Sequence, residues 1–339
     1  MRAYNKSRIV GQLLFVALGI TFIYYLLTPS VHQSDAVKPQ IRKANTDSII
    51  VYDMNEITAS ANAREKKEEV LILTPIARFY PEYWGNLLRL SYPRNLITLG
   101  FIVPSSRDGT KVHRELKAAV QAVQRGPVSQ RFADVKIMIQ DSGLSSGQSE
   151  TQRHKLEVQK ERRSKLASAR NTLLFSALGP KTSWVLWLDS DIVETPADLI
   201  DDMTSLDKDV LVANCYQRQG EKVVPYDFNS WIDSEPAKEL ASKMSKDEIL
   251  LEGYREFATF RTLMAYSYDE HADKRTLMKL DGVGTTALMV KAAVHRDGAV
   301  FPTFPFYHLI ESEGFAKMAS RLKYDIYGLP NYLVFHYNE

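Results

Sequence analysis

The chain has 339 residues, of which 45% are hydrophobic and 25% charged, a composition typical of a globular protein. Its formal net charge of +2 argues against a basic nucleic-acid-binding surface. The single cysteine, Cys215, excludes an intrachain disulfide framework and a cysteine-based zinc site. Regular patterning begins only near residue 69, so one large α/β domain with attachments is favoured over two domains.

The first part of the chain predicts a membrane anchor. Residues 9–27 form a mostly apolar run, which as a helix would reach about 28 Å, close to the thickness of a bilayer core. Residues 1–8 carry Arg2, Lys6 and Arg8 and no acidic residue, which favours a cytosolic amino terminus. A cleaved signal peptide is the alternative, but no small-x-small cleavage site follows the run. We therefore expect a single-pass type II protein whose remaining chain lies in a secretory lumen.

Residues 28–68 are mixed, polar and charged, and predict a luminal stem. The short apolar run Ile49–Tyr52 within it is a candidate for docking on the folded domain, which we expect over residues 69–339.

From residue 70 the chain alternates between apolar runs and amphipathic segments. Continuous apolar runs predict five buried strands, at residues 70–74, 96–103, 135–139, 184–188 and 210–213. We expect one helix capped by Thr110, a basic helix over about residues 162–178, and a third helix starting at Thr195-Pro196. This order predicts an α/β fold with a doubly wound, mostly parallel sheet, which binds ligands at the carboxyl ends of its strands.

The triplet Asp189-Ser190-Asp191 follows the fourth apolar run. Two carboxylates at the end of a buried strand are costly unless a cation meets them. In an extended chain positions i and i+2 face the same way, so both side chains can converge on one ion. Carboxylate oxygens suit Mn²⁺ or Mg²⁺, which can bridge a diphosphate and stabilise the charge of a departing nucleoside diphosphate. A solvated turn or helix cap is the structural alternative.

Two further motifs precede the triplet. Arg163 and Arg170 are seven residues apart on the basic helix and share a face, where their guanidinium groups could clamp phosphate oxygens. A solvated basic face explains them equally well. Thr74-Pro75-Ile76 ends the first strand, where a nucleotide base and ribose would sit in a doubly wound sheet.

The carboxyl-terminal part holds scattered candidates. Glycines flank Asp281, which with Glu311 could orient an acceptor hydroxyl or take its proton. His336 could complete a metal shell, although a lone histidine is more often structural. The aromatic residues near position 230 could stack on sugar rings or belong to the core, and these are Tyr226, Phe228 and Trp231.

Four segments in this order resemble one family. They are LILTPI (71–76), RRSKLASARN (162–171), VLWLDSD (185–191) and GLPNYLVFHYN (328–338). Together with the short tail, anchor and stem they resemble the fungal mannan polymerase subunits, glycosyltransferase family 62, over residues 69–339. The resemblance implies a GT-A fold and a metal-dependent, retaining α-1,6-mannosyl transfer from GDP-mannose with Mn²⁺, or with Mg²⁺ in its place. It also implies a Golgi membrane location and work in a hetero-oligomeric complex of homologous subunits that extends the mannan backbone on N-glycans.

Carried over by position, the resemblance assigns Asp189 and Asp191 to the catalytic centre, with Asp189 on the donor side and Asp191 on the metal. His336 becomes a second metal ligand. The donor pocket would comprise Thr74, Pro75, Ile76, Arg170 and Asn171, and we add Arg163 because it shares a helix face with Arg170. We add Asp141 to the donor pocket, and Asp281 and Glu311 to the catalytic residues, on their chemistry alone. No nucleophile is evident in the sequence.

Two other functions compete with this hypothesis. The chain could mainly scaffold a partner enzyme, although the intact triplet and His336 speak against a decayed site. It could be a nucleotidyltransferase, which shares the sheet and paired carboxylates, but the luminal anchor argues against that class.

Overall fold

The structure is a computed structural model that describes residues 49–141, 156–252 and 258–338. Contacts divide the chain into two units, residues 1–51 and 52–339, and the fold below is that of the second. Among the described residues no helix is long and apolar enough to cross a membrane. The expected anchor at residues 9–27 lies outside them.

The second unit contains the following elements in chain order. Its strands are β1 (Glu69–Pro75), β2 (Ile97–Pro104), β3 (Asp134–Gln140), β4 (Thr182–Leu188), β5 (Ile192–Glu194), β6 (Val210–Gln219), β7 (Lys222–Pro225), β8 (Trp231–Ile232), β9 (Thr262–Leu263), β10 (Met278–Lys279), β11 (Ala287–Lys291) and β12 (Ile326–His336). Its α-helices are α2 (Pro81–Arg89), α3 (Arg107–Gln124), α5 (Leu156–Ala177), α6 (Leu199–Thr204), α7 (Glu235–Ser242), α8 (Ala292–Arg296) and α9 (Glu311–Arg321). Its 3₁₀ turns are η1 (Arg94–Leu96), η2 (Val128–Gln130) and η3 (Met264–Tyr266).

Four of the predicted strands form a parallel block in the order β4-β1-β2-β3. In β1 and β4 the central residues are buried on both faces, which explains why their sequences read as unbroken apolar runs. The carboxyl ends of these strands lie at one edge of the sheet, and the triplet follows directly after β4. The parallel part of the prediction is therefore confirmed.

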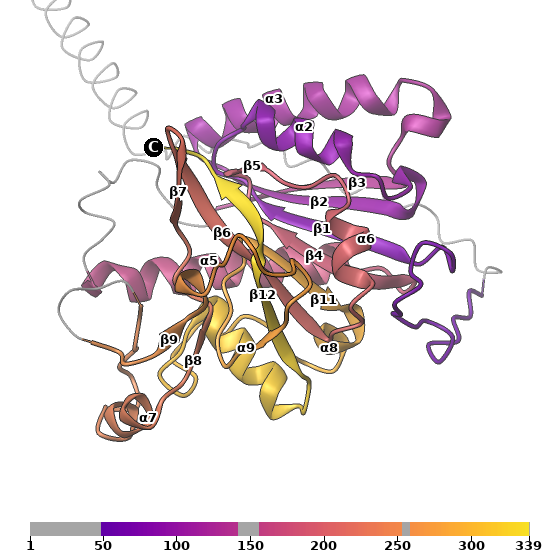
Figure 1. Cartoon of the computed structure of the whole chain (residues 1–339). Coiled ribbons are helices and arrows are strands. Elements are labelled where there is room, and N and C mark those ends of the chain that lie inside the picture. Colours follow the sequence, from indigo (N-terminus) through magenta and orange to yellow (C-terminus); the bar gives the residue numbers. More distant parts are fainter. Residues whose placement is uncertain (1–48, 142–155, 253–257, 339) are drawn as a thin grey trace, which may run out of the picture. The chain divides into compact units, whose positions relative to one another are not determined.

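The other half of the sheet departs from a purely parallel arrangement. Strand β11 lies antiparallel between β4 and β6, and β12 then pairs parallel with β6 (Figure 1). Short strands β5, β7 and β10 add antiparallel pairs at this side. The sequence did not predict the strands after Ala213. Glycine and proline interrupt the apolar pattern of β12, and β11 is a short run next to polar loops.

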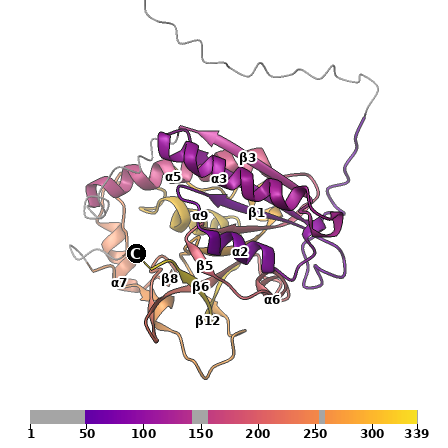
Figure 2. The same cartoon turned by 90° about the horizontal axis from the view of Figure 1, so that it is seen from above.

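Two hydrophobic cores, one on each face, hold helices against the sheet. One core includes side chains of α2, α3 and α6, and the other includes side chains of α5, α8 and α9. In Figure 1 α2 and α3 lie above the sheet and α8 and α9 below it, and Figure 2 looks down onto α2 and α3. Helices on both faces confirm a doubly wound, mixed α/β architecture.

Two local expectations were wrong. Helix α3 is capped by Ser106, whose Oγ accepts a hydrogen bond from the Gly109 amide at 3.2 Å, because the chain already turns after β2. Thr110 lies inside the helix and donates to the Ser106 carbonyl. Helix α6 begins at Leu199 rather than at Pro196, whose carbonyl accepts the Leu199 amide in a turn.

The segment before β1 also differs from a free stem. Residues 49–51 are exposed and belong to the first unit, so the docking of the run Ile49–Tyr52 stays a prediction. Ala63, in contrast, is buried in a core. Glu68 accepts hydrogen bonds from Ser60 and from the Trp184 indole at 2.8 Å, which fastens this end of the segment to β4.

Candidate active site

The triplet lies where β4 leaves the sheet. β4 ends at Leu188, and the Ile192 amide then donates to the Asp189 carbonyl at 3.1 Å, so the triplet forms a turn rather than extended chain. The predicted reason for convergence, strand alternation, is therefore wrong. Ser190 is buried, whereas the side chains of Asp189 and Asp191 remain 25% and 39% exposed. Both carboxylates emerge at the sheet edge, but each meets a different partner.

Asp189 is held by Arg170, a buried residue of α5. Nη2 of Arg170 lies 2.8 Å from Asp189 Oδ1, and its Nε lies 2.8 Å from Glu311 Oε1. The guanidinium also lies near the rings of Trp187 and Phe301. Within the described part of the chain, Nη1 is buried without a hydrogen-bond partner. A buried cation needs its full set of acceptors, so Nη1 is a donor that a bound ligand oxygen could satisfy.

The protonation states in this cluster follow from burial and from charge. Burial raises the pKa of Asp189 to about 6, although Arg170 opposes the shift. Burial also acts to raise the pKa of Glu311, but the positive charges of Arg170 and Arg163 outweigh it, and the net shift is downward. The charges of Asp189 and Glu311 raise the pKa of Arg170 against the effect of burial. Arg170 and Glu311 are thus charged near neutral pH, and a cation beside Asp189 would favour its ionised form.

Asp191 meets His336, which is buried at the end of β12. His336 Nε2 lies 3.1 Å from Asp191 Oδ2, and Nδ1 lies 2.7 Å from the Tyr337 carbonyl oxygen. A carbonyl only accepts, so Nδ1 carries a proton and Nε2 is the nitrogen turned to the carboxylate. That contact is favourable when Nε2 is protonated or when a cation lies between the two groups.

Asp191 and His336 are the residues that could hold a metal. One carboxylate and one imidazole favour a transition metal such as Mn²⁺ over Mg²⁺, which prefers oxygen ligands. Among the residues that the structure describes, no group of three or more histidine, cysteine, aspartate and glutamate side chains could hold an ion. The donor set therefore fits a metal that takes its remaining ligands from a bound anion or from water.

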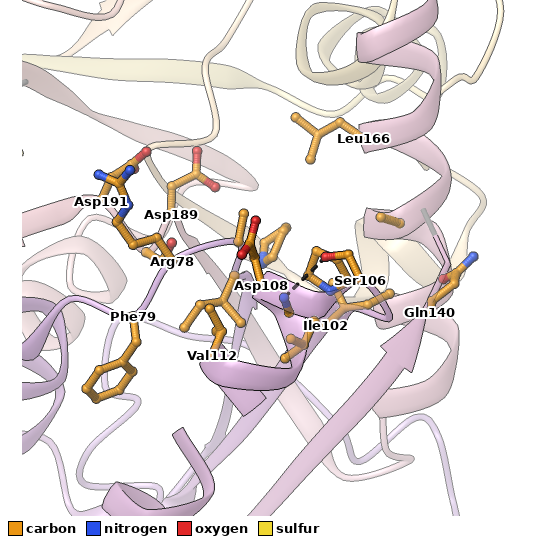
Figure 3. Close-up of a pocket in the computed structure, with 18 of the residues that line it drawn as sticks. Arg78, Phe79, Ile102, Ser106, Asp108, Val112, Gln140, Leu166, Asp189 and Asp191 are labelled. Atoms are coloured by element: carbon orange, nitrogen blue, oxygen red, sulfur yellow. Dashed lines mark hydrogen bonds between the residues drawn. The ribbon is translucent and has the colours of Figure 1, made fainter. Parts of the chain in front are cut away.

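A cavity of 1200 Å³ opens beside the two carboxylates. In Figure 3 Asp189 and Asp191 lie at one end of it, Gln140 lies at the other and Asp108 lies between them. Its walls come from the ends of β1 and β2 and from α3 and α5, and they combine apolar side chains with cations. The apolar ones include Ile76, Ile102, Val112 and Leu166, and the cations include Arg78, Lys111, Arg162 and Lys165. This mixture suits a nucleotide, with a flat base and charged phosphates.

The structure brings several predicted donor residues to this cavity and places others behind it. Pro75, Ile76, Arg170, Asp189 and Asp191 line the wall. Asp141 follows the lining residue Gln140 and is exposed.

Thr74 and Asn171 lie behind the wall. The hydroxyl of Thr74 donates to the Leu188 carbonyl and pairs with the Tyr83 hydroxyl, which joins β1 to β4. Both polar atoms of the Asn171 amide bond the backbone of Phe301 at 2.7 and 3.0 Å.

Arg163 is not among the residues that line the cavity. Its Nη1 lies 3.1 Å from Glu313 Oε1, and its Nη2 donates to Asn229 Oδ1 at 2.9 Å. Arg261 joins the same buried carboxylate at 3.5 Å. Arg162, its neighbour in sequence, lines the cavity together with Arg78 and Arg170. Which of the two neighbouring arginines, Arg162 or Arg163, faces the cavity depends on the rotation of α5 about its axis. The basic composition of this segment did not reveal that rotation.

The two residues assigned to catalysis by chemistry alone lie in different places. Glu311 stands at the first position of α9, with φ of +57°, an unfavourable region for this residue type that accompanies its bond to Arg170. Asp281 is exposed, and its Oδ2 accepts from the Asp233 amide at 2.9 Å. It lies beside the small β8–β9 sheet and is not among the residues that line the cavity.

Sequence reasoning missed Asp227, a buried carboxylate near the triplet. Its Oδ1 accepts from the backbone and side-chain amides of Asn229 at 2.9 and 2.6 Å. Burial raises its pKa. Burial also raises the pKa of the Cys215 thiol, and the negative charges of Asp227, Asp191 and Asp189 add to that shift. A Cβ on Gly284 would lie 1.7 Å from Asp227 Oδ2. Two features of the sequence could have indicated Asp227: its position between aromatic residues, and the Gly-Val-Gly segment that makes room for its carboxylate.

Comparison with known proteins gives a consistent result. Residues 48–305 match the Anp1 family. The chain is 71% identical over 339 residues to the mannan polymerase complex subunit mnn9 of Schizosaccharomyces pombe, with 100% of both chains covered. It is 55% identical to the mannan polymerase complex subunit MNN9 of Candida albicans, covering 99% of this chain and 97% of that protein. The mannan polymerase II complex ANP1 subunit of Saccharomyces cerevisiae is 34% identical, with 98% and 68% covered.

Among solved structures, the chain aligns with the mannosyltransferase PcManGT from Pyrobaculum calidifontis in complex with GDP-Man and Mn²⁺. The TM-score is 0.44 at 12% identity, with 83% of this chain and 59% of that chain covered.

Proposed function

The chain belongs to the Anp1 family, and we propose that it is a subunit of a fungal mannan polymerase complex that transfers mannose from GDP-mannose to a mannosylated N-glycan in α-1,6 linkage. The names of its relatives support the complex and the polymer. The donor, the metal and the linkage rest on the resemblance of the four sequence segments and on the site described above.

One observation carries the proposal. A cavity with apolar walls and several cations ends at two partly exposed carboxylates, one held by a buried arginine and the other facing a histidine. A nucleoside diphosphate-sugar needs this combination, because its base, phosphates and sugar differ in polarity along one molecule. The volume of 1200 Å³ is large enough for a ligand of that size.

In this proposal Asp191 and His336 hold Mn²⁺, with Mg²⁺ as the alternative ion. Bound there, the ion would supply positive charge that stabilises the departing diphosphate. Asp189 does not need to move, because Arg170 already fixes its position through a 2.8 Å bond. Preorganised groups of this kind stabilise a transition state without reorganisation during the reaction.

Arg170 has a second part in this scheme. Its Nη1 group, buried and without a partner among the described residues, donates to an oxygen of the bound donor. Glu311 holds the other side of the guanidinium and so determines the direction of Nη1. Retention of configuration proceeds by front-side attack, with the diphosphate taking the proton of the acceptor hydroxyl.

The location of the enzyme belongs to the same proposal. Residues 9–27 would anchor it in the Golgi membrane as a single-pass type II protein, with residues 69–339 in the lumen. Protease treatment of sealed membrane vesicles tests this orientation. A tag at the carboxyl end should survive until detergent opens the vesicles, and cleavage in intact vesicles would refute a luminal domain.

The activity is tested with the full chain, purified alone and with its complex partners. GDP-mannose, Mn²⁺ and an α-1,6-mannobioside are supplied, and the linkage in the product is assigned by NMR. Asp191→Asn and His336→Gln should each reduce transfer at least a hundredfold, an effect on the order of that for one charge-stabilising group. Asp134→Asn, at an exposed carboxylate on β3, is the matched control. Equal transfer by the wild-type and Asp191→Asn complexes would refute the metal role and favour a scaffold, whereas no transfer by the wild type with its partners would refute the proposed activity.

A further inference from the structure

Two aromatic side chains are presented together near the metal-facing end of the site. Phe228 is half-buried, and the side chain of Tyr266 is 71% exposed. Their ring centroids lie 5.7 Å apart, with an angle of 40° between the ring planes. Exposing a large ring to water is unfavourable, so two adjacent rings at the surface indicate a place where a ligand covers them.

The backbone under these rings is firmly held. Tyr266 ends η3, whose first two residues, Met264 and Ala265, are fully buried. The Met264 amide donates to the Ser230 carbonyl at 2.9 Å, and the Tyr216 hydroxyl donates to the Ala265 carbonyl. A ring fixed in this way loses little conformational entropy when a ligand packs on it.

One member of the aromatic pair lies close in sequence to a residue that contacts His336. Tyr226 stacks on His336, with ring centroids 3.7 Å apart and an angle of 17°, and Phe228 comes two residues later. None of the described residues between Tyr226 and Tyr266 lines the donor cavity. Asp191 and His336 therefore stand between the cavity, on the β1–β2 side, and the aromatic pair, on the β6 side.

We propose that Phe228 and Tyr266 form the platform on which a mannose residue of the acceptor packs, an assignment that rests on the proposed function for the identity of the sugar. A pyranose ring has a face of C–H bonds that covers an aromatic ring and removes both from water. The two rings carry no charge, which fits a neutral sugar and does not fit a second phosphate group. The platform holds the acceptor chain on the side of the carboxylates opposite the nucleotide.

The test uses the purified complex and methyl α-1,6-mannobioside as the probe. Variants are Tyr266→Ala, Tyr266→Trp and the control Phe175→Ala, which removes a ring that is 68% exposed on α5. Three quantities are measured: the KM for the mannobioside, the KM for GDP-mannose, and binding of the mannobioside without donor by saturation-transfer NMR. Tyr266→Ala should raise the acceptor KM about three- to tenfold, as expected for the loss of one stacked ring. Its KM for GDP-mannose should not change, and Tyr266→Trp should restore the acceptor KM.

Each result decides the matter. If the wild type binds the mannobioside and the Tyr266→Ala variant does not, the platform is supported, even if neither protein transfers mannose. The absence of transfer would refute only the proposed function. If Tyr266→Ala has the same acceptor KM and the same mannobioside binding as the wild type, the platform is overturned. A loss of the same size in Phe175→Ala, or a rise in the KM for GDP-mannose as large as that for the acceptor, would also overturn it.

Discussion

Arg170 Nη2 lies 2.8 Å from Asp189 Oδ1, and this pair joins the middle of α5 to the end of β4. The arginine is 2% exposed. Its partner Asp189 is therefore bound to a buried cation and is not a free surface carboxylate. Because the same guanidinium also bonds Glu311 at 2.8 Å, one side chain positions acidic groups from two distant segments. The shape of the site on this side depends on a single buried cation.

Replacing Arg170 should therefore affect both stability and catalysis. Arg170→Met leaves Asp189 and Glu311 without their counter-charge, and we expect a loss of about 3 kcal/mol in the free energy of unfolding. Arg170→Lys keeps the charge but cannot bond both acids, so it should fold better than Arg170→Met and still transfer mannose poorly. Urea unfolding and the transfer assay measure the two effects.

The control for this prediction is Arg114→Met, at an exposed position of α3. It should change the free energy of unfolding by less than about 0.5 kcal/mol. An Arg170→Met variant as stable as Arg114→Met would show that the buried pair contributes nothing to the fold.

His295, which like Arg170 packs against the Trp187 ring, predicts a pH dependence of stability. Its Nδ1 donates to the Ala299 carbonyl at 2.8 Å, and its Nε2 accepts from the Trp187 indole at 3.1 Å. Burial lowers its pKa from 6.5 to about 4. Between these two values the unfolded chain binds more protons than the folded one, so the stabilising effect is complete above pH 6.5 and is lost as the pH falls towards 4.

The measurement compares the wild type with His295→Gln, whose side chain does not titrate. From pH 7 to pH 5 the wild type should lose about 2 kcal/mol more of its free energy of unfolding than the variant loses. His271→Gln, at an exposed histidine, should follow the wild type. Parallel pH profiles for the wild type and His295→Gln would contradict a neutral buried imidazole.

Gly284 and Asp227 should show strong coupling. A methyl group at position 284 would lie 1.7 Å from Asp227 Oδ2, so Gly284→Ala should cost about 2 kcal/mol through overpacking. Adding Asp227→Ala removes the clashing oxygen and should recover part of the loss, which a double-mutant cycle of unfolding free energies would detect. Gly179→Ala, where the added methyl group would meet its nearest neighbour at 3.6 Å, is the control. Additive effects would mean that the two residues do not meet.

Donor binding can be measured without catalysis. GDP with Mn²⁺ should raise the melting temperature of the wild type, because a ligand bound only by the folded state stabilises it. Chelation of the metal by EDTA, or His336→Gln, should remove most of this increase, since each removes a part of the proposed metal site. An equal increase with UDP would contradict the choice of a guanine nucleotide, and an increase that persists in EDTA would contradict metal-dependent binding.

The sequence alone revealed the strands that are buried on both faces. β1, β2 and β4 appear as apolar runs because they are buried on both sides, whereas β3 at the edge of the sheet is only partly buried. It also located the triplet at the end of β4, where ligands bind in a parallel sheet. The insertion of β11 against β4 could not be predicted, since antiparallel pairing there depends on contacts between segments about 100 residues apart.

The directions of side chains were harder to predict than their positions along the chain. Arg163 and Arg170 both lie on α5, but Arg163 pairs with Glu313 behind the site and Arg170 with Asp189 within it. The resemblance paired His336 with Asp191, yet only the folded β12 brings the two residues within 3.1 Å. Asp227 was not predicted because nothing near it in sequence shows that the antiparallel β6–β7 pair returns it to Cys215, whose carbonyl accepts from the Asp227 amide.

Local sequence determined that this protein would have a parallel strand block ending in Asp189-Ser190-Asp191, because burial and strand ends leave a pattern in consecutive residues. Tertiary structure decided which cation and which imidazole meet those two carboxylates. Arg170 and His336 are 19 and 145 residues away from their acidic partners, and the pairing depends on the packing of α5 and β12 against one sheet. Long-range packing leaves no local pattern, so only the folded chain shows it.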